Sequence, residues 1–451
     1  MSSSLASLAA RGRAWLSGEG VVSVLSRGSV GSLVANGLAA LIGVASHMVL
    51  ARLLGVASFG HYSYVWTVAS LLVIVGTLGF DTAQVRFVAA YRVAERWPAL
   101  AGLLRFGNRL VLAAATAVAA LAALGVWAFG QGLDPELRLT LWAGFLALPG
   151  MALLGLQGAV LQGLRRVVLS KIPDVLLRPL LAVGFTGLAL LVLGSVRAPG
   201  AMLATGLALL VALALGQLLV ARNLPPAVRA AAPEHDGGEW LRVSLPLLLV
   251  AGMRLLMTQT DVLLLGALVG TREAGIYTAA ARLGQLITFG QNAANGIAAP
   301  LISELHTQED RAGLQRIVTL TSWGATVWAL GATLALLAAG PWLLERWGPE
   351  FRTALTALVI LSAGQVVNAL SGPVGYLLNM TGHQGVNARI LAWTVGLNFL
   401  LAAPAILWLG MNGAALVTAL MTAVKNIWTW VEVRRRLELN SSVFRLGKAA
   451  P

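Results

Sequence analysis

The chain has 451 residues, of which 58% are hydrophobic and 11% charged, and its mean hydropathy is +0.80. Soluble globular proteins carry roughly 25% charged residues, so this composition excludes a soluble fold. The net charge is +14, and the sequence has no cysteine, which excludes disulfides and thiolate metal sites.

Apolar runs of the length that crosses a bilayer recur along almost the whole chain. A helix needs about 20 apolar residues to cross roughly 30 Å of hydrocarbon. The first six runs lie near residues 29–51, 63–85, 107–130, 139–162, 173–194 and 199–221. The next six lie near residues 243–269, 275–300, 317–344, 353–378, 388–410 and 412–432. The sequence therefore predicts an all-α, polytopic membrane protein with 12 transmembrane helices.

One polar connection, rich in proline and glycine, separates the two sets of six runs. The predicted organisation is a cytoplasmic or interfacial lead (1–26), an N-terminal six-helix bundle (27–221), a cytoplasmic linker (222–240), a C-terminal six-helix bundle (241–432) and a cytoplasmic tail (433–451).

The two predicted bundles share fragments of one signature. Leu54-Gly55 is followed by Gly60 and Tyr62, and 215 residues later Val269-Gly270 is followed by Gly275 and Tyr277. We therefore expect two copies of one unit that face each other. In transporters built from such repeats, the substrate lies at the interface between the copies.

Basic residues gather at one side of the predicted topology. With the N-terminus in the cytoplasm, 21 arginines and lysines fall on the inner side and six on the outer side. The positive-inside rule then places both termini in the cytoplasm, and it accounts for the positive charge without a nucleic-acid partner. The basic inner surface also suits anionic membrane lipids.

Charged residues within the predicted spans are candidates for function. Arg254 lies near the middle of the seventh span, with Thr258 and Asp261 at i+4 and i+7 on the same helical face. These residues are candidates for binding a charged ligand. The alternative to ligand binding is an internal ion pair of Asp261 with Arg254 or Arg282 that only holds the helices together. Arg178 and Lys425 lie nearer to span ends, so we expect them to reach the cytoplasmic headgroups.

Polar stripes run along the second and eighth spans at equivalent places. The second span carries Ser63, Thr67, Ser70, Thr77, Asp81 and Gln84, and the eighth carries Thr278, Arg282, Gln285 and Asn292. The first span adds Asn36, Gly43 and His47 on one face. Such residues also serve as packing contacts between membrane helices. Asp81 and Asp261 are the candidates for a coupling ion, which would be Na⁺ or H⁺.

The sequence has no phosphate-binding G-x4-G-K-[ST] loop, no H-E-x-x-H motif and no cluster of histidines and carboxylates at metal-ligand spacing. The predicted loops are too short for a catalytic domain. We therefore expect neither an enzyme nor a metal site or other cofactor.

Six segments, in their order and spacing, resemble the polysaccharide flippases of the MATE-like (MOP) exporter superfamily. They are Val49–Tyr62, Gly79–Phe87, Gln259–Gly266, Gly275–Ala280, Asn379–Gly382 and Asn412–Ala415. The resemblance covers about residues 27–432. It implies two bundles in the cytoplasmic (inner) membrane that move polyprenyl (undecaprenyl) pyrophosphate-linked oligosaccharide from the inner to the outer leaflet by alternating access, for polysaccharide or O-antigen biosynthesis. Polysaccharide polymerases or ligases are the partners that it implies.

For this substrate, Arg254 and Arg282 are the cations expected to bind pyrophosphate. The full set of candidate residues for pyrophosphate and sugar is Arg254, Arg282, Asn36, Thr67, Ser70, Thr77, Thr258, Gln285 and Asn292. Two other functions stay open. One is a cation-coupled multidrug exporter of the same superfamily that depends on Asp81 or Asp261, and the other is a non-transporting scaffold for glycan assembly.

Overall fold

The computed structural model describes residues 21–443, with side chains from residue 36 onward. Residues 1–20 of the predicted lead and residues 444–451 of the predicted tail lie outside the described residues. The described chain contains helices and no β-strands, as the composition predicts.

The helices of the first half follow the predicted runs with one exception: the second run, 63–85, is divided at Leu78-Gly79 between the end of one helix and the start of the next, where both residues have a positive φ. The helices are α2 (Val21–Thr77), α3 (Phe80–Val93), α4 (Trp97–Phe129), η1 (Gly130–Gly132), α5 (Pro135–Gly163), α6 (Val167–Lys171), η2 (Ile172–Leu177), α7 (Arg178–Leu193) and α8 (Ala198–Asn223). The backbone of Gly55, with φ of 74° and ψ of 167°, divides α2 into two arms. Glycine reaches this conformation without steric cost, which explains the glycine at this turn.

The second half begins after α9 (Pro226–Ala230), a short helix in the predicted linker. Its elements are α10 (Gly237–Leu268), α11 (Thr271–Thr307), α12 (Arg311–Trp347), η3 (Pro349–Ala354), α13 (Leu355–Leu370), α14 (Val374–Met380), α15 (Gln384–Leu409) and α16 (Met411–Leu437). Gly270, with φ of 141°, separates α10 from α11 at the position equivalent to Gly55.

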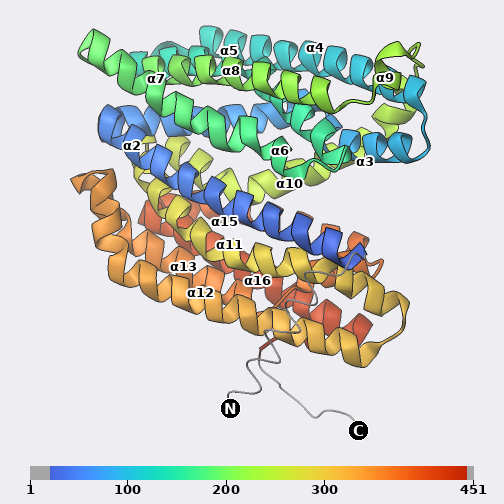
Figure 1. The fold of residues 1–451 in the computed structure, drawn as a ribbon. Coiled ribbons are helices and arrows are strands. Elements are labelled where there is room, and N and C mark those ends of the chain that lie inside the picture. The colour runs from blue at the N-terminus through green and yellow to red at the C-terminus, as the bar shows by residue number, and fades with distance from the viewer. Residues whose placement is uncertain (1–20, 444–451) are drawn as a thin grey trace, which may run out of the picture.

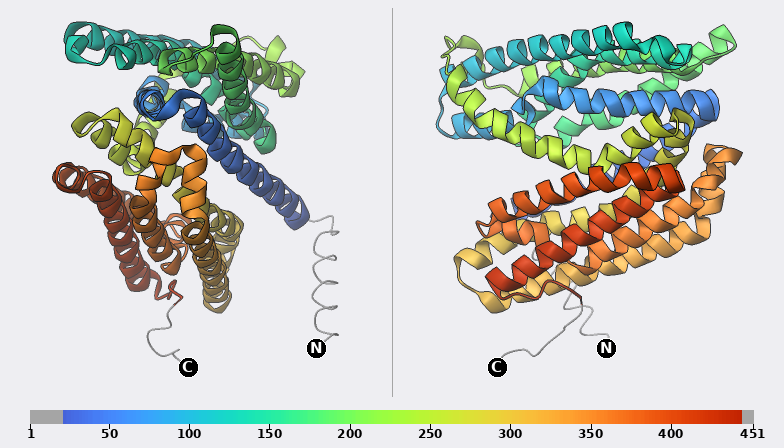
Figure 2. Two further views of the ribbon diagram at one scale, coloured as in Figure 1. Left: turned by 90° about the vertical axis from the view of Figure 1, so that its left-hand side faces the viewer. Right: turned by 180° about the vertical axis from the view of Figure 1, so that it is seen from behind.

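The helices form two groups with α2 and α10 between them. Figure 1 shows α4, α5, α7 and α8 on one side and α11, α12, α13 and α16 on the other, and Figure 2 shows the same division from two further directions. The arms of α2 pack on α4 and α5 of the first group and on α11 of the second. Helix α10 packs on α2 and α3 as well as on α11 and α15.

Ten helical segments in the described part of the chain are long and apolar enough to cross a membrane. The two arms of α2 count as one segment, and α11 is not among the ten. Helix α11 carries Arg282, Gln285, Gln291, Asn292 and Asn295, which lower its hydropathy. The fold is therefore that of a multi-pass membrane protein, while the number of twelve crossings stays a prediction.

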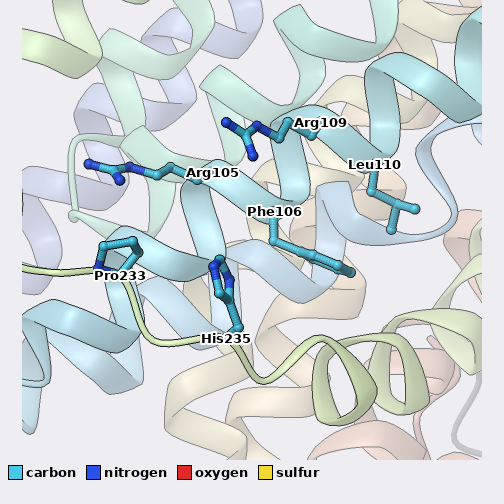
Figure 3. Close-up of a pocket in the computed structure, with 6 residues that line it drawn as sticks. All are labelled: Arg105, Phe106, Arg109, Leu110, Pro233 and His235. Atoms are coloured by element: carbon cyan, nitrogen blue, oxygen red, sulfur yellow. The ribbon is translucent and has the colours of Figure 1, made fainter.

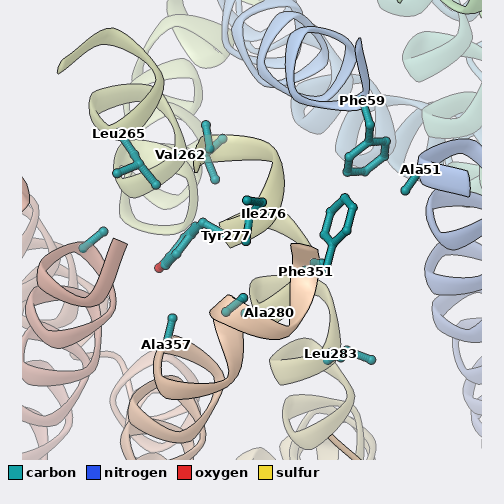
Figure 4. Close-up of a cluster of buried hydrophobic side chains, with 14 of the residues drawn as sticks. Ala51, Phe59, Val262, Leu265, Ile276, Tyr277, Ala280, Leu283, Phe351 and Ala357 are labelled. Carbon is teal, nitrogen blue, oxygen red and sulfur yellow. The ribbon is translucent and has the colours of Figure 1, made fainter. Parts of the chain in front are cut away.

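The two copies of the signature meet where α2 contacts α11. A side-chain carbon on Gly275 would lie 2.6 Å from the Gly60 Cα, and one on Gly60 would collide with the Thr271 carbonyl oxygen. The two backbones are thus in direct contact, which only glycine allows. Next to this contact, the ring of Phe59 lies 5.7 Å from that of Trp347 and 5.8 Å from that of Phe351, measured between ring centres. Figure 4 shows Phe59 and Phe351 facing each other in the shared core.

We predict that Gly60→Ala and Gly275→Ala each lower the stability of the protein by about 1–3 kcal/mol, because the added methyl group meets backbone atoms that cannot move aside. The measurement is the melting temperature of the purified protein in detergent. Gly125→Ala on α4 is the matched control, since nothing lies within 4 Å of the added carbon. Melting temperatures as high as the control's would contradict the proposed backbone contact.

Candidate functional site

A narrow cleft lies between the first-half helix α2 and the second-half helices α10 and α11. Its lining consists of His47, Ser63, Trp66, Thr67, Thr258, Gln259, Val262, Thr278, Ala281, Arg282 and Gln285. Its volume is about 20 Å³, which accommodates a single water molecule. The helices must therefore separate before a larger molecule enters.

The cleft lies around the axis that relates the two copies of the repeat. Four pairs of lining residues are 215 positions apart: His47 and Val262, Ser63 and Thr278, Trp66 and Ala281, and Thr67 and Arg282. Equivalent positions therefore face each other across the cleft. The side chains at these positions nevertheless differ between the copies. His47 of the first copy corresponds to Val262, and Arg282 of the second copy corresponds to Thr67.

Arg282 is the charged residue that lines this cleft. Its Nη2 atom lies 3.5 Å from Nε2 of His47. The other ring nitrogen of His47, Nδ1, lies 2.8 Å from the Gly43 carbonyl oxygen and can only donate to it. Nε2 is then an acceptor for the guanidinium, so His47 is neutral in this arrangement. The sequence analysis places Arg282 and His47 on polar faces of two different spans, and the structure brings these two side chains together.

Arg178 is a site residue that the sequence interpretation missed. Its guanidinium carbon lies 4.5 Å from the centre of the Trp66 ring, which lines the cleft, and its Nε lies 2.8 Å from Oδ1 of Asp174. Its side chain is only 16% exposed. The expectation that Arg178 reaches the headgroups is therefore wrong.

The reason is the local backbone. The π-helical turn η2 precedes Arg178, with Pro173 inside it and Pro179 just after it. A π-helical turn inserts an extra residue and rotates the helix that follows, which here directs Arg178 inward. Arg178 also lies within electrostatic range of Arg282.

Hydroxyl groups form most of the remaining polar lining. Thr67 donates to the Ser63 carbonyl oxygen at 2.9 Å, Thr278 to the Ala274 oxygen at 2.7 Å and Thr258 to the Leu255 oxygen at 3.0 Å. These bonds satisfy the hydroxyl protons within each helix and leave oxygen lone pairs directed outward.

The other predicted stripe residues lie outside the cleft lining. Ser70 donates to the Trp66 oxygen at 2.8 Å, and the buried Thr77 donates to the Ile74 oxygen at 3.0 Å. Asn36 and Asn292 are exposed. The structure thus brings together Thr67, Thr258, Arg282 and Gln285 from the predicted set.

Arg254 lies one turn before Thr258 on α10, and its side chain is exposed. Lys425 of α16, which we expected at the headgroups, is half-buried and within electrostatic range of Arg254. Neither Arg254 nor Lys425 has a carboxylate within 4.0 Å among the described residues.

Asp261 does not pair with either arginine, contrary to the ion-pair alternative. It is only 7% exposed and accepts hydrogen bonds from the Tyr277 hydroxyl at 2.5 Å, the Val262 amide at 2.8 Å and the Thr418 hydroxyl at 3.4 Å. Asp261 faces α11 and α16, whereas Arg254, two turns earlier, is exposed. The predicted common face is split because the neighbours of α10 change along its length.

Asp81 lies in the first turn of α3, apart from the cleft lining. Its Oδ1 atom is buried and has no hydrogen-bond partner among the described residues. Gln84, one turn later, is fully buried, and neither atom of its amide group has a partner there. Asp81 and Gln84 therefore have buried polar atoms without hydrogen bonds, whereas the Asp261 carboxylate accepts hydrogen bonds from three donors.

The repeat supplies a matched test of the Asp261 cluster. Tyr277 donates to a carboxylate, while its counterpart Tyr62 lies 3.1 Å from the neutral Thr205 hydroxyl. We predict that Tyr277→Phe costs about 1.5–3 kcal/mol of stability and Tyr62→Phe about 0.5–1.5 kcal/mol, because hydrogen bonds to charged groups are the stronger ones. Chemical denaturation in detergent micelles measures both losses. Equal losses would show that the carboxylate adds nothing to the bond.

Comparison with known proteins identifies the family of the chain and proteins of similar fold. A family model described as "Polysaccharide biosynthesis protein" matches residues 25–306, more than half of the chain. The probable low-salt glycan biosynthesis flippase Agl15 of Haloferax volcanii is 23% identical over 168 residues, which are 37% of this chain and 36% of that protein. The chain thus matches about a third of the length of this relative.

Solved structures match over nearly the whole chain. An inward-facing multidrug resistance MATE family transporter of the MOP superfamily has a TM-score of 0.72 at 12% identity, with 89% of this chain and 94% of that chain covered. The lipid II flippase MurJ, in an inward closed conformation, has a TM-score of 0.68 at 11% identity, with 89% and 87% covered. These likenesses confirm the predicted MATE-like fold. The chain belongs to the polysaccharide biosynthesis protein family.

Proposed function

We propose that this protein is a flippase that moves polyprenyl (undecaprenyl) pyrophosphate-linked oligosaccharide from the inner to the outer leaflet of the cytoplasmic membrane. In this proposal, residues 27–221 and 241–432 are two six-helix bundles that alternate between inward-open and outward-open arrangements, and both termini are cytoplasmic. The oligosaccharide passes between the bundles while the polyprenyl chain stays in the bilayer. The relatives named as flippases support this function.

The charge of the cleft is the observation that carries the proposal. Arg282 lines it, Arg178 lies directly behind Trp66, and none of the lining residues is acidic. A pyrophosphate group needs such cations in a site of low dielectric constant, where charge-assisted hydrogen bonds are strong. The hydroxyl and amide groups around them suit the sugar hydroxyls.

Energetics favour the same direction of transport. An inside-negative potential assists the outward movement of an anion by roughly 2.3 kcal/mol per charge per 100 mV. The closed cleft of about 20 Å³ is consistent with a state between the two open arrangements. Arg254 and Lys425 would then meet the pyrophosphate at another stage of the same movement.

We predict that Arg282→Gln and Arg254→Gln slow flipping by roughly tenfold to a hundredfold, because each removes a charge-assisted hydrogen bond of about 1.5–3 kcal/mol. The measurement is the leaflet location of the undecaprenyl-linked oligosaccharide in depleted cells that express each variant. Arg352→Gln is the control, since Arg352 is exposed and pairs with Glu345 at 2.9 Å, away from the cleft.

Accumulation on the cytoplasmic leaflet, reversed by the wild type and by the control variant but not by Arg282→Gln or Arg254→Gln, supports the proposal. Normal export by both arginine variants would overturn the site assignment and favour a non-transporting scaffold. The multidrug exporter alternative requires resistance to cationic dyes that depends on Asp81 or Asp261. A cleft without a lining carboxylate argues against such cations as substrates.

Asp81 is the better candidate for a coupling ion, because Oδ1 of Asp81 is buried without a donor while Asp261 is already satisfied. If transport is coupled, we predict that Asp81→Asn abolishes the dependence of flipping on a Na⁺ or H⁺ gradient. Asp261→Asn would lower stability and leave that dependence intact. Flipping by reconstituted protein, with each gradient imposed in turn, measures both effects. An unchanged gradient response in Asp81→Asn would exclude Asp81 from coupling.

A further inference from the structure

A second pocket, which shares no lining residue with the cleft, lies between α4 and the linker that joins the two halves. Its volume is about 340 Å³, and it is lined by Arg105, Phe106, Arg109, Leu110, Pro233 and His235. Figure 3 shows Arg105 and Arg109 leaving α4 on the same side, with His235 rising from the linker toward them. The proposed substrate path does not use this pocket.

The linker wall of the pocket is held firmly on α4. The Glu234 amide donates to the Pro98 carbonyl oxygen at 3.1 Å, and the Glu234 carboxylate pairs with Arg96 at 3.4 Å. A side-chain carbon on Gly102 would fall directly onto the Glu234 carbonyl oxygen, so the linker backbone touches the helix there. The pocket is therefore a built feature and not a gap beside a loose loop.

The two arginines of the pocket lack acidic partners. Neither Arg105 nor Arg109 has a carboxylate within 4.0 Å among the described residues, and the nearby Glu234 is engaged by Arg96. Arg105 and Arg109 are four residues apart on one helix, where like charges repel each other. An anion between the two guanidinium groups would remove this repulsion and accept hydrogen bonds from both.

The depth of the pocket indicates where such an anion comes from. After Arg109, α4 continues from Leu110 to Phe129 without a charged residue, a stretch of 20 residues that matches the hydrocarbon thickness of about 30 Å. Arg105 and Arg109 therefore lie at the level of the lipid headgroups. Phe106 and Leu110 provide an apolar lining beside them that continues toward the acyl chains.

We propose that this pocket binds the phosphate group of an anionic phospholipid in the leaflet on which the linker lies. Arg105 and Arg109 hold the phosphate, His235 contributes a further hydrogen bond, and Leu110 and Phe106 contact the start of the acyl chain. Basic pockets beside membrane helices recognise anionic headgroups in this way. Because Pro233 and His235 belong to the linker, a bound lipid ties the linker between the halves to α4.

The test is lipid binding to the full-length protein in nanodiscs, measured by native mass spectrometry as the retention of phosphatidylglycerol relative to phosphatidylcholine. We expect the Arg105→Gln/Arg109→Gln double variant to bind phosphatidylglycerol roughly tenfold more weakly or worse. Arg316→Gln, which removes an exposed arginine on α12, is the control and should bind as the wild type does. An unchanged melting temperature in phosphatidylcholine nanodiscs shows that the double variant is folded.

Two results would overturn the proposal. One is equal retention of phosphatidylglycerol by the double variant and the control. The other is full displacement of phosphatidylglycerol by millimolar inorganic phosphate, which would assign the pocket to a free anion. Since flipping of the proposed substrate is not measured here, failure of this test leaves the flippase proposal unaffected, and the reverse also holds.

Discussion

The contact between Gly60 and Gly275 is the constraint on which the rest of the structure depends. Each glycine lies at the same position of its copy, and the missing side chains let α2 and α11 touch through their backbones. This contact fixes the axis of the repeat. Two turns along the same helices, Thr67 and Arg282 then face each other across the cleft, so the packing of two small residues determines where these polar side chains lie.

The two copies kept their geometry and diverged in chemistry. Tyr62 and Tyr277 occupy equivalent positions. The Tyr62 hydroxyl lies 3.1 Å from the Thr205 hydroxyl on α8, the last helix of the first half. Tyr277 donates to Asp261, which also accepts a hydrogen bond from Thr418 on α16, the last helix of the second half. Where the second copy has the buried Asp261, the first has Ser46, which is also buried. A shared scaffold with different side chains gives a nearly symmetric cleft that carries an asymmetric charge, which suits the proposed substrate with its one anionic end.

The sequence predicted much of the fold because its main signals are local. Hydropathy and the glycine signature were sufficient for most helix positions and for the meeting of the copies, but not for the breaks at Leu78-Gly79 and Ser371–Pro373 inside two predicted runs. The arginine of the cleft also followed from the repeat. Arg178 and Asp261 were misplaced for a different reason: the π-helical turn before Arg178 and the changing neighbours of α10 depend on packing between distant segments, which helical periodicity does not contain. For the same reason, the sequence did not predict the pocket that Arg105 and Arg109 form with the linker.

The way in which Arg282 is held explains how a cation can wait inside a membrane protein for an anion. A buried guanidinium is costly without a partner, and a carboxylate partner would neutralise it and compete with the substrate. Here the contacting group is the neutral imidazole of His47, which accepts one hydrogen bond and carries no charge. Arg178 differs, because it lies over the face of Trp66 and also pairs with the carboxylate of Asp174 at 2.8 Å. The charge of Arg282 is therefore stabilised without being cancelled, and in the proposed function it is the group that pairs with the pyrophosphate of the substrate.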